Sequence, residues 1–276
     1  MPAFDLEAYL NRISYRGPRD ASLATLSALQ WHHVRAIPFE NLDVLLGREI
    51  RIDLPSIERK LVRDRRGGYC FEQNHLFAAA LREFGYGVTP LSARVRWQVL
   101  PGISTPLTHM LLQVDCEGAR FISDVGFGSL SLTAPLALAT EAEQATPHEP
   151  RRLIRQMPVD GSGMLIMQQA RLGAEWADVY QFTLQPQAPI DYELANWFTS
   201  NHPESRFRQN LTASRATDTG RHTILNGEFT TRYPDGRVEK RVIASPDDLL
   251  AVLAAHFDLH FPTGTRFGPP GSAWPS

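Results

Sequence analysis

Arg65-Arg66-Gly67-Gly68-Tyr69-Cys70-Phe71-Glu72-Gln73-Asn74 is the stretch from which the rest of this chain can be interpreted. Its two glycines let the backbone turn through conformations that other residues resist. They precede a run of helical composition that continues to Phe84, and Gly85 favours a helix end there. Cys70 therefore falls in the first turn of a predicted helix.

A cysteine in this position is a candidate nucleophile. The first turn of a helix has unpaired backbone N–H groups and the positive end of the helix dipole, and both favour an anion. With arginines nearby in the sequence, we expect the Cys70 thiol to ionise more easily than a free cysteine. The alternative is that Cys70 is a small buried apolar residue, so other residues must support a catalytic role.

Composition and charge argue against several classes of protein. The 276 residues are 43% hydrophobic and 21% charged, which is typical of a globular protein with two or three compact units. A formal charge of −2 does not suit a surface for nucleic acid or for an anionic membrane. Two cysteines are too few for a disulfide framework. The N-terminus does not have the profile of a secretory signal, and apolar stretches such as 249–255 are too short to span a membrane. We expect a soluble, cytoplasmic protein.

The chain changes character twice. Helical patterns occupy the first 86 residues, with helices expected over 4–15, over 20–35 with Asp20 as the N-cap, and from Pro55 through Leu61. After Gly87 the pattern has period two and predicts an antiparallel sheet that closes into a small barrel or sandwich. Its expected strands cover residues 91–97, 109–114, 119–125, 163–170 and 179–184.

The C-terminal part begins with a connecting segment of helical character, from about 189 to 207. Asn226-Gly227 then marks a hairpin between two strands, and Asp235-Gly236 marks a second hairpin turn before a strand that ends at Ile243. Ser245 followed by a proline and two acids predicts the capped start of a last helix.

A nucleophilic cysteine needs a base and a group that orients the base, and one hairpin supplies both. A turn centred on Cys116-Glu117 would pair Val114 with Ala119. The same register places His109 directly opposite Asp124, on one face of the sheet, with Cβ atoms about 4.5–5.5 Å apart. A slip of one residue would put them on opposite faces. The alternatives are a polar residue at a strand end for His109 and a turn-forming acid for Asp124.

Four motifs together resemble the arylamine N-acetyltransferase family, in order and in separation. They are Arg66-Gly67-Gly68-Tyr69-Cys70-Phe71-Glu72-Gln73-Asn74, Pro38-Phe39-Glu40-Asn41-Leu42, His109-Met110-Leu111 and Asp124-Val125-Gly126-Phe127-Gly128. The likeness covers nearly the whole chain. It implies an α+β, multidomain fold with a cysteine-protease-like core. The implied units are an N-terminal helical bundle (1–86), a central antiparallel β-barrel (87–188), an interdomain helix (189–210) and a C-terminal α/β lid (211–276).

The resemblance also implies a catalytic triad of Cys70, His109 and Asp124, and a function. The family transfers an acetyl group from acetyl-CoA to arylamines, arylhydrazines or N-hydroxyarylamines, in a role in xenobiotic metabolism. The expected mechanism is ping-pong, through an acetyl-cysteine at Cys70, with His109 as the base and Asp124 holding the imidazole. Acetyl-CoA is then a co-substrate, and no permanently bound cofactor or metal is expected.

Further site residues follow from the same resemblance. The acceptor pocket is expected to be lined by Phe39, Val95 and Phe127, although each could equally be ordinary core. Coenzyme A is expected near Gly126, Gly128 and Phe198. An ion pair is expected between Glu40 and Arg66.

Three other functions stay open at this point. A papain- or transglutaminase-type enzyme could use the same triad on a peptide or glutamine. A specialised amide synthase could use a tethered polyketide acyl group. A ligand-binding module without activity would leave Cys70 inert.

Overall fold

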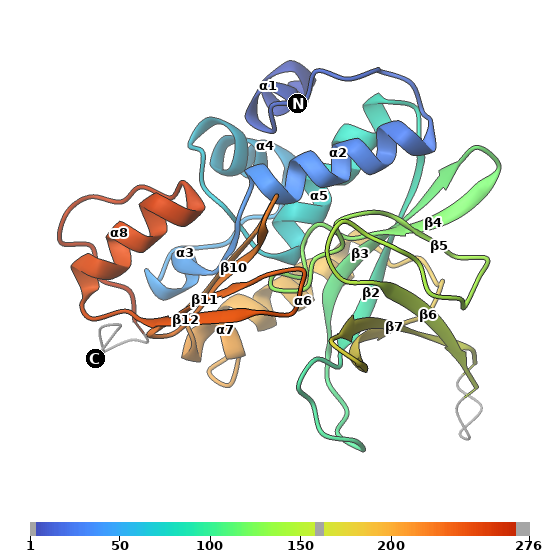
Figure 1. Ribbon diagram of the computed structural model, residues 1–276. Coiled ribbons are helices and arrows are strands. Elements are labelled where there is room, and N and C mark those ends of the chain that lie inside the picture. Colours follow the sequence, from blue (N-terminus) through green and yellow to red (C-terminus); the bar gives the residue numbers. More distant parts are fainter. Residues whose placement is uncertain (1–3, 158–162, 269–276) are drawn as a thin grey trace.

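The computed structural model describes residues 4–157 and 163–268, and its mixture of helices and two sheets confirms the α+β fold class (Figure 1). The helices are α1 (Leu6–Arg12), α2 (Leu23–Ala36), α3 (Leu42–Leu45), α4 (Leu54–Glu58), α5 (Cys70–Glu83), α6 (Pro189–Asn201), α7 (Arg206–Gln209) and α8 (Pro246–Phe257). A π-helical turn, η1 (Arg59–Arg63), continues α4. None of the helices in the described part of the chain is long and apolar enough to cross a membrane.

The predicted cap of the second helix was wrong by two residues. Ser22 caps α2, because its hydroxyl accepts from the Thr25 N–H at 3.2 Å. Asp20 supports this cap instead, since its carboxylate accepts from the Ser22 and Thr25 hydroxyls at 2.6 and 2.7 Å. The cap of α8 is confirmed, with the Ser245 hydroxyl accepting from the Asp248 N–H at 3.0 Å.

Seven strands form the larger sheet, in the order β5-β4-β3-β2-β8-β7-β6. They are β2 (Gly87–Val95), β3 (Leu107–Cys116), β4 (Ala119–Ser123), β5 (Leu136–Ala137), β6 (Arg151–Gln156), β7 (Leu165–Leu172) and β8 (Glu175–Phe182). Gln144 nearly closes this sheet into a barrel. Its side chain makes two hydrogen bonds to the Ala137 backbone at one edge, and its backbone makes two to Arg151 at the other.

The smaller sheet has five strands in the order β1-β9-β10-β11-β12. They are β1 (Phe39–Glu40), β9 (Thr212–Thr217), β10 (Gly220–Leu225), β11 (Glu228–Arg232) and β12 (Val238–Val242). The two predicted hairpin turns join β10 to β11 and β11 to β12. Because β1 comes from the N-terminal region and pairs with β9, this sheet ties the C-terminal part of the chain to the segment before Cys70.

Four strands were not predicted, for physical reasons that differ. Strands β1 and β5 are two residues long and carry no period-two signal. Strand β6 begins with Arg151, a charged side chain that the fold buries completely. Strand β9 has no large apolar residue and therefore no period-two signal, although its two threonines favour a strand.

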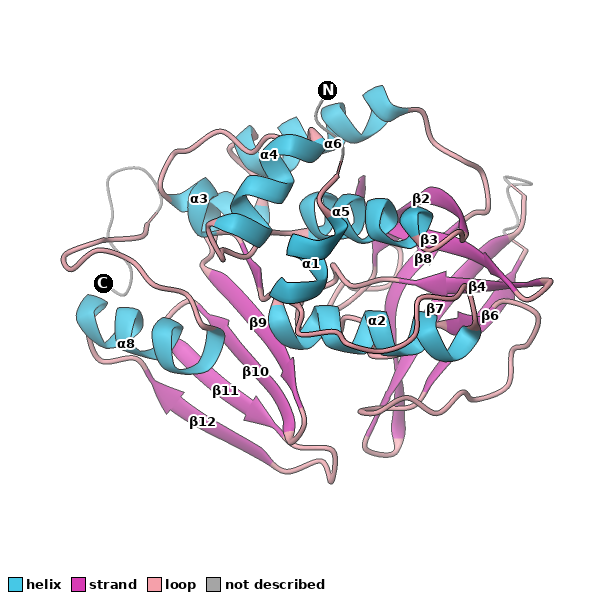
Figure 2. Cartoon of the chain, turned by 90° about the horizontal axis from the view of Figure 1, so that it is seen from above, coloured by secondary structure: helices cyan, strands magenta, loops and turns pink. Residues whose placement is uncertain are grey.

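Three hydrophobic clusters form the core, one among the helices and the face of β3, one inside the seven-stranded sheet and one between α8 and the five-stranded sheet. Figure 2 shows the two sheets on either side of the helical region that contains α5. Helix α5 packs on β2 and β3. The domain limits at 86, 188 and 210 stay a prediction.

The glycines before Cys70 have a different role from the one expected. Neither Gly67 nor Gly68 adopts a left-handed φ; Arg65 does, at 51°. The glycines are needed for close approach, because a Cβ on Gly67 would lie 2.3 Å from the Pro38 carbonyl oxygen. Gly68 forms a parallel bridge with Phe39, so a larger residue at position 67 would separate the Cys70 segment from β1.

Candidate active site

Cys70 is the first residue of α5, as the sequence predicted, and only 3% of its surface is exposed. Its sulfur lies 3.6 Å from the carbonyl oxygen of Thr108, the residue before His109 on β3. The Glu72 carboxylate accepts from the Tyr69 N–H at 3.1 Å, and this holds the start of the helix in place. The first N–H groups of α5 have no intrahelical acceptor and point toward the thiol end of the helix.

His109 and Asp124 form a buried pair, with Nε2 2.8 Å from Oδ2. Since Nε2 is occupied by the carboxylate, Nδ1 is the ring nitrogen left to exchange a proton with Cys70. The Cys70 side chain is near enough to contribute, with Asp124, to the raised pKa of His109. The structure therefore brings all three predicted triad residues together.

The register that predicted this pair was wrong. In the structure Cys116 pairs with Ala119, so the turn is Glu117-Gly118 and every pairing is shifted by two residues. Both turn residues have positive φ, 49° and 77°, which suits a two-residue hairpin turn. A shift of two keeps each side chain on its original face. His109 and Asp124 are therefore diagonal neighbours rather than opposed residues, and they still meet.

Asn74 is a site residue that the sequence analysis did not assign. Its amide nitrogen donates to Asp124 Oδ1 at 2.9 Å and to the Met110 carbonyl at 2.7 Å. Its amide oxygen accepts from the Val125 N–H at 3.1 Å. The signal was available, because Asn74 lies four residues after Cys70 and so faces the same side of the helix. Asn74 links α5 to β3, which carries the base, and to the loop after β4, which carries the acid.

Opposing effects set the protonation of the pair. Burial lowers the pKa of His109, but the Asp124 charge and hydrogen bond outweigh it and raise the pKa to about 10. Burial likewise raises the pKa of Asp124, and the His109 charge together with hydrogen bonds from Asn74 and Gly126 lower it overall. The pair is thus imidazolium and carboxylate near neutral pH.

Aromatic rings surround the imidazole. Phe127 lies edge-on to it, with ring centroids 5.2 Å apart, and the fully buried Tyr180 lies 5.0 Å away. Val95 pairs with Tyr180 across the sheet. Phe39 is buried against Phe207 instead, at 5.8 Å between centroids. Apolar walls of this kind suit an aryl ring beside the base.

Phe198 is a second predicted residue that the structure does not place against the triad. It lies on α6 and stacks on His202, with centroids 4.5 Å apart. Among the described residues, no hydrogen bond or ring contact joins Phe198 to Cys70, His109 or Asp124.

Glu40 and Arg66 form the expected ion pair, at 2.9 Å, within a larger buried network. Arg66 also lies 3.2 Å from Asp43, and Lys60 joins Asp43 to Glu72 at 3.1 and 2.7 Å. The network therefore connects the segment before Cys70 with the helix that follows it. Among residues 4–157 and 163–268, no group of three or more His, Cys, Asp or Glu could hold a metal ion.

Gly126 is required where the Asp124 loop crosses α5. A Cβ at this position would lie 2.7 Å from Cys70 Cα and 2.7 Å from Asn74 Nδ2, closer than real Cβ atoms come. We expect Gly126→Ala to push the loop away from the helix, lowering the activity of this site at least about tenfold and the free energy of unfolding by about 1–3 kcal/mol. Steady-state kinetics and urea unfolding would measure both.

Gly102→Ala is the matched control for this change. Gly102 has a positive φ, 81°, but apart from its two chain neighbours no described residue lies within 4 Å of the place that a Cβ would occupy. Alanine there should cost some stability through backbone strain and leave the activity unchanged. If Gly126→Ala kept the parental activity, the predicted clash of a Cβ at this position with Cys70 and Asn74 would be contradicted.

A second buried ion cluster joins the two sheets. Glu149 pairs with Arg151 on β6 and, at 2.7 Å, with Arg221 on β10. Burial raises the pKa of Glu149, and the two arginine charges outweigh this and lower it to about 2. We expect Glu149→Gln to reduce the free energy of unfolding by about 3–5 kcal/mol near neutral pH, because two buried cations lose their partner.

This loss should depend on pH. A depressed carboxyl pKa contributes stability above its unfolded value near 4.5, and that contribution is lost as pH falls toward 2. The difference between the parent and Glu149→Gln should therefore shrink between pH 4.5 and 2, as measured by urea unfolding. Glu143→Gln, which removes an exposed pair with Arg171, should cost less than about 1 kcal/mol at any pH.

Comparison with known proteins adds an independent line of evidence. The model of a family described as N-acetyltransferase matches residues 22–265. The arylamine N-acetyltransferase of Escherichia coli is 41% identical over 256 residues, covering 92% of this chain and 88% of that protein. The Salmonella typhimurium protein named arylamine N-acetyltransferase / N-hydroxyarylamine O-acetyltransferase is 40% identical over 255 residues, with 92% and 88% covered.

A solved structure of Mycobacterium marinum arylamine N-acetyltransferase, in complex with CoA, superposes with a TM-score of 0.87. It is 35% identical and covers 92% of each chain. The identities and coverage confirm the resemblance carried by the sequence motifs. This chain belongs to the arylamine N-acetyltransferase family.

Proposed function

We propose that the protein transfers the acetyl group of acetyl-CoA to the nitrogen of arylamines and arylhydrazines, and to the oxygen of N-hydroxyarylamines. The observation that carries this proposal is the buried His109–Asp124 hydrogen bond beside a thiol at the start of α5. The names of the relatives support arylamines and N-hydroxyarylamines as acceptors.

The first half-reaction acetylates Cys70. His109 holds the thiol proton on Nδ1, and the thiolate attacks the thioester carbonyl carbon of acetyl-CoA. The carbonyl oxygen becomes an oxyanion, for which the first N–H groups of α5 are candidate donors. The bond to the coenzyme A sulfur then breaks, His109 returns the proton to that sulfur, and acetyl-Cys70 remains.

The second half-reaction consumes acetyl-Cys70. The acceptor nitrogen attacks the acetyl carbon while His109 takes its proton, and the Cys70 thiolate leaves. An aryl ring against Phe127, with Val95 and Phe39 as further walls, would place the nitrogen near the imidazole. The same walls exclude water, so that transfer competes with hydrolysis.

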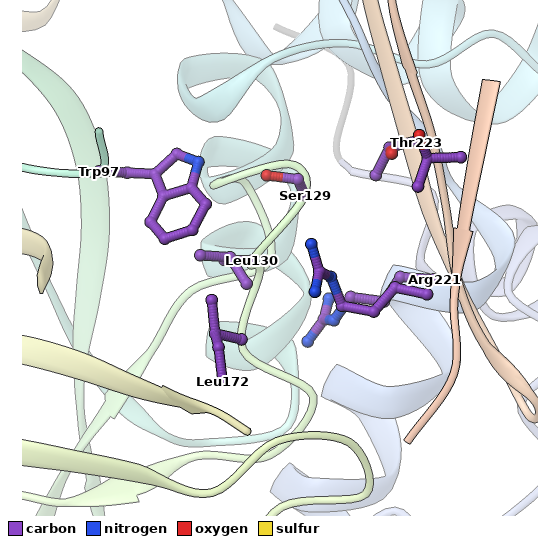
Figure 3. Close-up of a pocket in the computed structure, with 8 residues that line it drawn as sticks. Trp97, Ser129, Leu130, Leu172, Arg221 and Thr223 are labelled. Atoms are coloured by element: carbon purple, nitrogen blue, oxygen red, sulfur yellow. The ribbon is translucent and has the colours of Figure 1, made fainter. Parts of the chain in front are cut away.

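A cavity between the two sheets is the candidate place for the coenzyme A phosphates (Figure 3). It has a volume of about 50 Å³, with Trp97, Ser129 and Leu130 on the barrel side. Arg221 and Arg232 approach from the other sheet. Gly126 and Gly128 lie just before Ser129, and their loop runs from this cavity to Asp124. The M. marinum relative was solved with CoA, which supports a coenzyme A site in this chain. Phe198, on α6, stays a proposed contact of coenzyme A.

Incubation with acetyl-CoA and aniline tests the proposal. We expect acetanilide to form, with initial-rate plots that give the parallel lines of a ping-pong reaction. A peptide- or glutamine-directed enzyme would give no acetanilide, and an amide synthase would accept longer acyl thioesters in place of acetyl-CoA. A module without activity would show Cys70 alkylated by iodoacetamide no faster than Cys116.

A further inference from the structure

A chain of buried polar side chains, unused by the proposed mechanism, runs from α1 to the segment before Cys70. The Tyr9 hydroxyl oxygen lies 2.8 Å from His33 Nδ1, and His33 Nε2 lies 2.7 Å from Gln73 Oε1. The Gln73 amide nitrogen lies 2.8 Å from the Pro38 carbonyl oxygen and 3.1 Å from that of Gly68. Tyr9, His33 and Gln73 are all 0% exposed.

Only one arrangement of protons satisfies this chain. Two carbonyl oxygens can only accept, so the Gln73 nitrogen must face them and its oxygen must face His33. His33 Nε2 then carries the proton, and the bare Nδ1 accepts from the Tyr9 hydroxyl. Burial keeps the imidazole neutral by lowering the pKa of His33 to about 4. The two carbonyls and the Nε2–H of His33 on α2 therefore hold the Gln73 amide in one orientation, and Tyr9 on α1 holds His33 in the matching tautomer.

The two carbonyls that Gln73 holds belong to the junction that leads into α5. The Gly68 N–H donates to Pro38 at 3.3 Å, and the Gly68 carbonyl accepts from the Glu40 N–H at 3.1 Å. Gln73 bonds both sides of this junction from the interior, and it stands in the first turn of α5, three residues after Cys70. The bonds therefore fix the direction from which the backbone enters the helix.

We propose that Gln73, oriented by His33 and Tyr9, is a positioning residue for the chemistry of Cys70. It holds the start of α5, and so it places both the thiol and the candidate oxyanion N–H groups relative to His109. Gln73 touches none of the reacting atoms. The inference rests on the proposed function, because it assigns Gln73 a part in the same reaction.

Gln73→Glu is the sharpest test, since it keeps the shape and replaces only the donating amide group. Near pH 7.5 the carboxylate would face two carbonyl oxygens, so we expect Cys70 alkylation by iodoacetamide and kcat for acetanilide formation each to fall at least about tenfold. Near pH 5.5 the buried carboxyl group is protonated and donates to one carbonyl. The ratio of variant to parent rates should then recover at least about threefold, while circular dichroism shows the fold retained.

A second variant and a control accompany this test. Tyr9→Phe removes only the donor to His33 and should lower the same rates about threefold, since one neutral hydrogen bond is lost at a distance. His32→Gln is the matched control, because the half-buried His32 bonds the Ile13 carbonyl at 3.0 Å, outside the chain of side chains. It should leave both rates unchanged.

The outcomes separate the two proposals. The positioning role would be refuted if Gln73→Glu kept the parental rates of alkylation and acetanilide formation at both pH 7.5 and pH 5.5. It would also be refuted if the variant lost the same fraction of these rates at both pH values. If Gln73→Glu does not fold, parental rates for Tyr9→Phe would refute it. If iodoacetamide alkylates Cys70 of the parent protein no faster than Cys116, the proposed function is refuted, and this inference with it.

Discussion

Cys70→Ser is expected to abolish acetyl transfer. The serine hydroxyl keeps the size of the thiol, but its proton is far harder to remove, so the imidazole cannot generate a comparable nucleophile. After incubation with acetyl-CoA alone, intact-protein mass measurement should show one acetyl group on the parent and none on Cys70→Ser. Rates of acetanilide formation should fall by at least about a thousandfold.

Cys116→Ser is the matched control for this change. Cys116 is equally buried, at 3% exposure, and its sulfur lies 3.4 Å from the Ala21 carbonyl, away from the triad. The variant should acquire the acetyl group at the parental rate. Acetyl incorporation into Cys70→Ser would refute the assignment of Cys70 as the nucleophile.

Asp124→Asn is expected to lower kcat by roughly a thousandfold to ten-thousandfold with the fold retained. Asp124 Oδ1 accepts from Asn74 Nδ2 and from the Gly126 N–H, each at 2.9 Å. An asparagine must keep its oxygen against these two donors, so its amide nitrogen would face His109 Nε2. That places the His109 proton on Nδ1, the nitrogen that must accept the thiol proton. The variant would hold the wrong tautomer.

The pH dependence of this variant gives a second measurement. A His109 pKa of about 10, above the ordinary value of 6.5, contributes stability that is complete below pH 6.5 and is lost as pH rises through 10. Urea unfolding should therefore show the largest difference between parent and Asp124→Asn near pH 6, and a smaller one near pH 10. If the difference in unfolding free energy between the parent and Asp124→Asn were the same near pH 6 and near pH 10, the charged His109–Asp124 pair would be contradicted.

The hairpin turn at Glu117-Gly118 shows how much of the site could be predicted from local sequence patterns. The alternation along β3 and β4 predicted a hairpin and put His109 and Asp124 on one face, but it placed the turn one residue too early. Moving the turn by one residue shifts every cross-strand pair by two residues. Because side chains alternate with a period of two, His109 and Asp124 still lie on the same face of the sheet. An error of one residue in pairing would have separated the base from the acid.

Other contacts could not be predicted from local patterns. The partners of Asn74 on β3 and after β4, and the partner of Gln73 on α2, are 36 or more positions away in the sequence, and β1 is too short to produce a pattern of its own. A buried arginine such as Arg151 even argues against the strand it begins, because the cost of burying it is offset by Glu149 and by the Leu130 carbonyl, which the fold brings to it.

The amino-acid sequence by itself determined the helix that begins at Cys70, the alternating strands that carry His109 and Asp124, and the family to which the motifs point. Periodicity, caps and turn residues act within a few positions of one another, so these features can be recognised locally. Only the tertiary structure decided the strand register, the need for glycine at 67 and 126, and the hydrogen bonds of Gln73 and Asn74. These depend on where distant backbone carbonyls and side chains meet, and such meetings are set by packing of the whole chain.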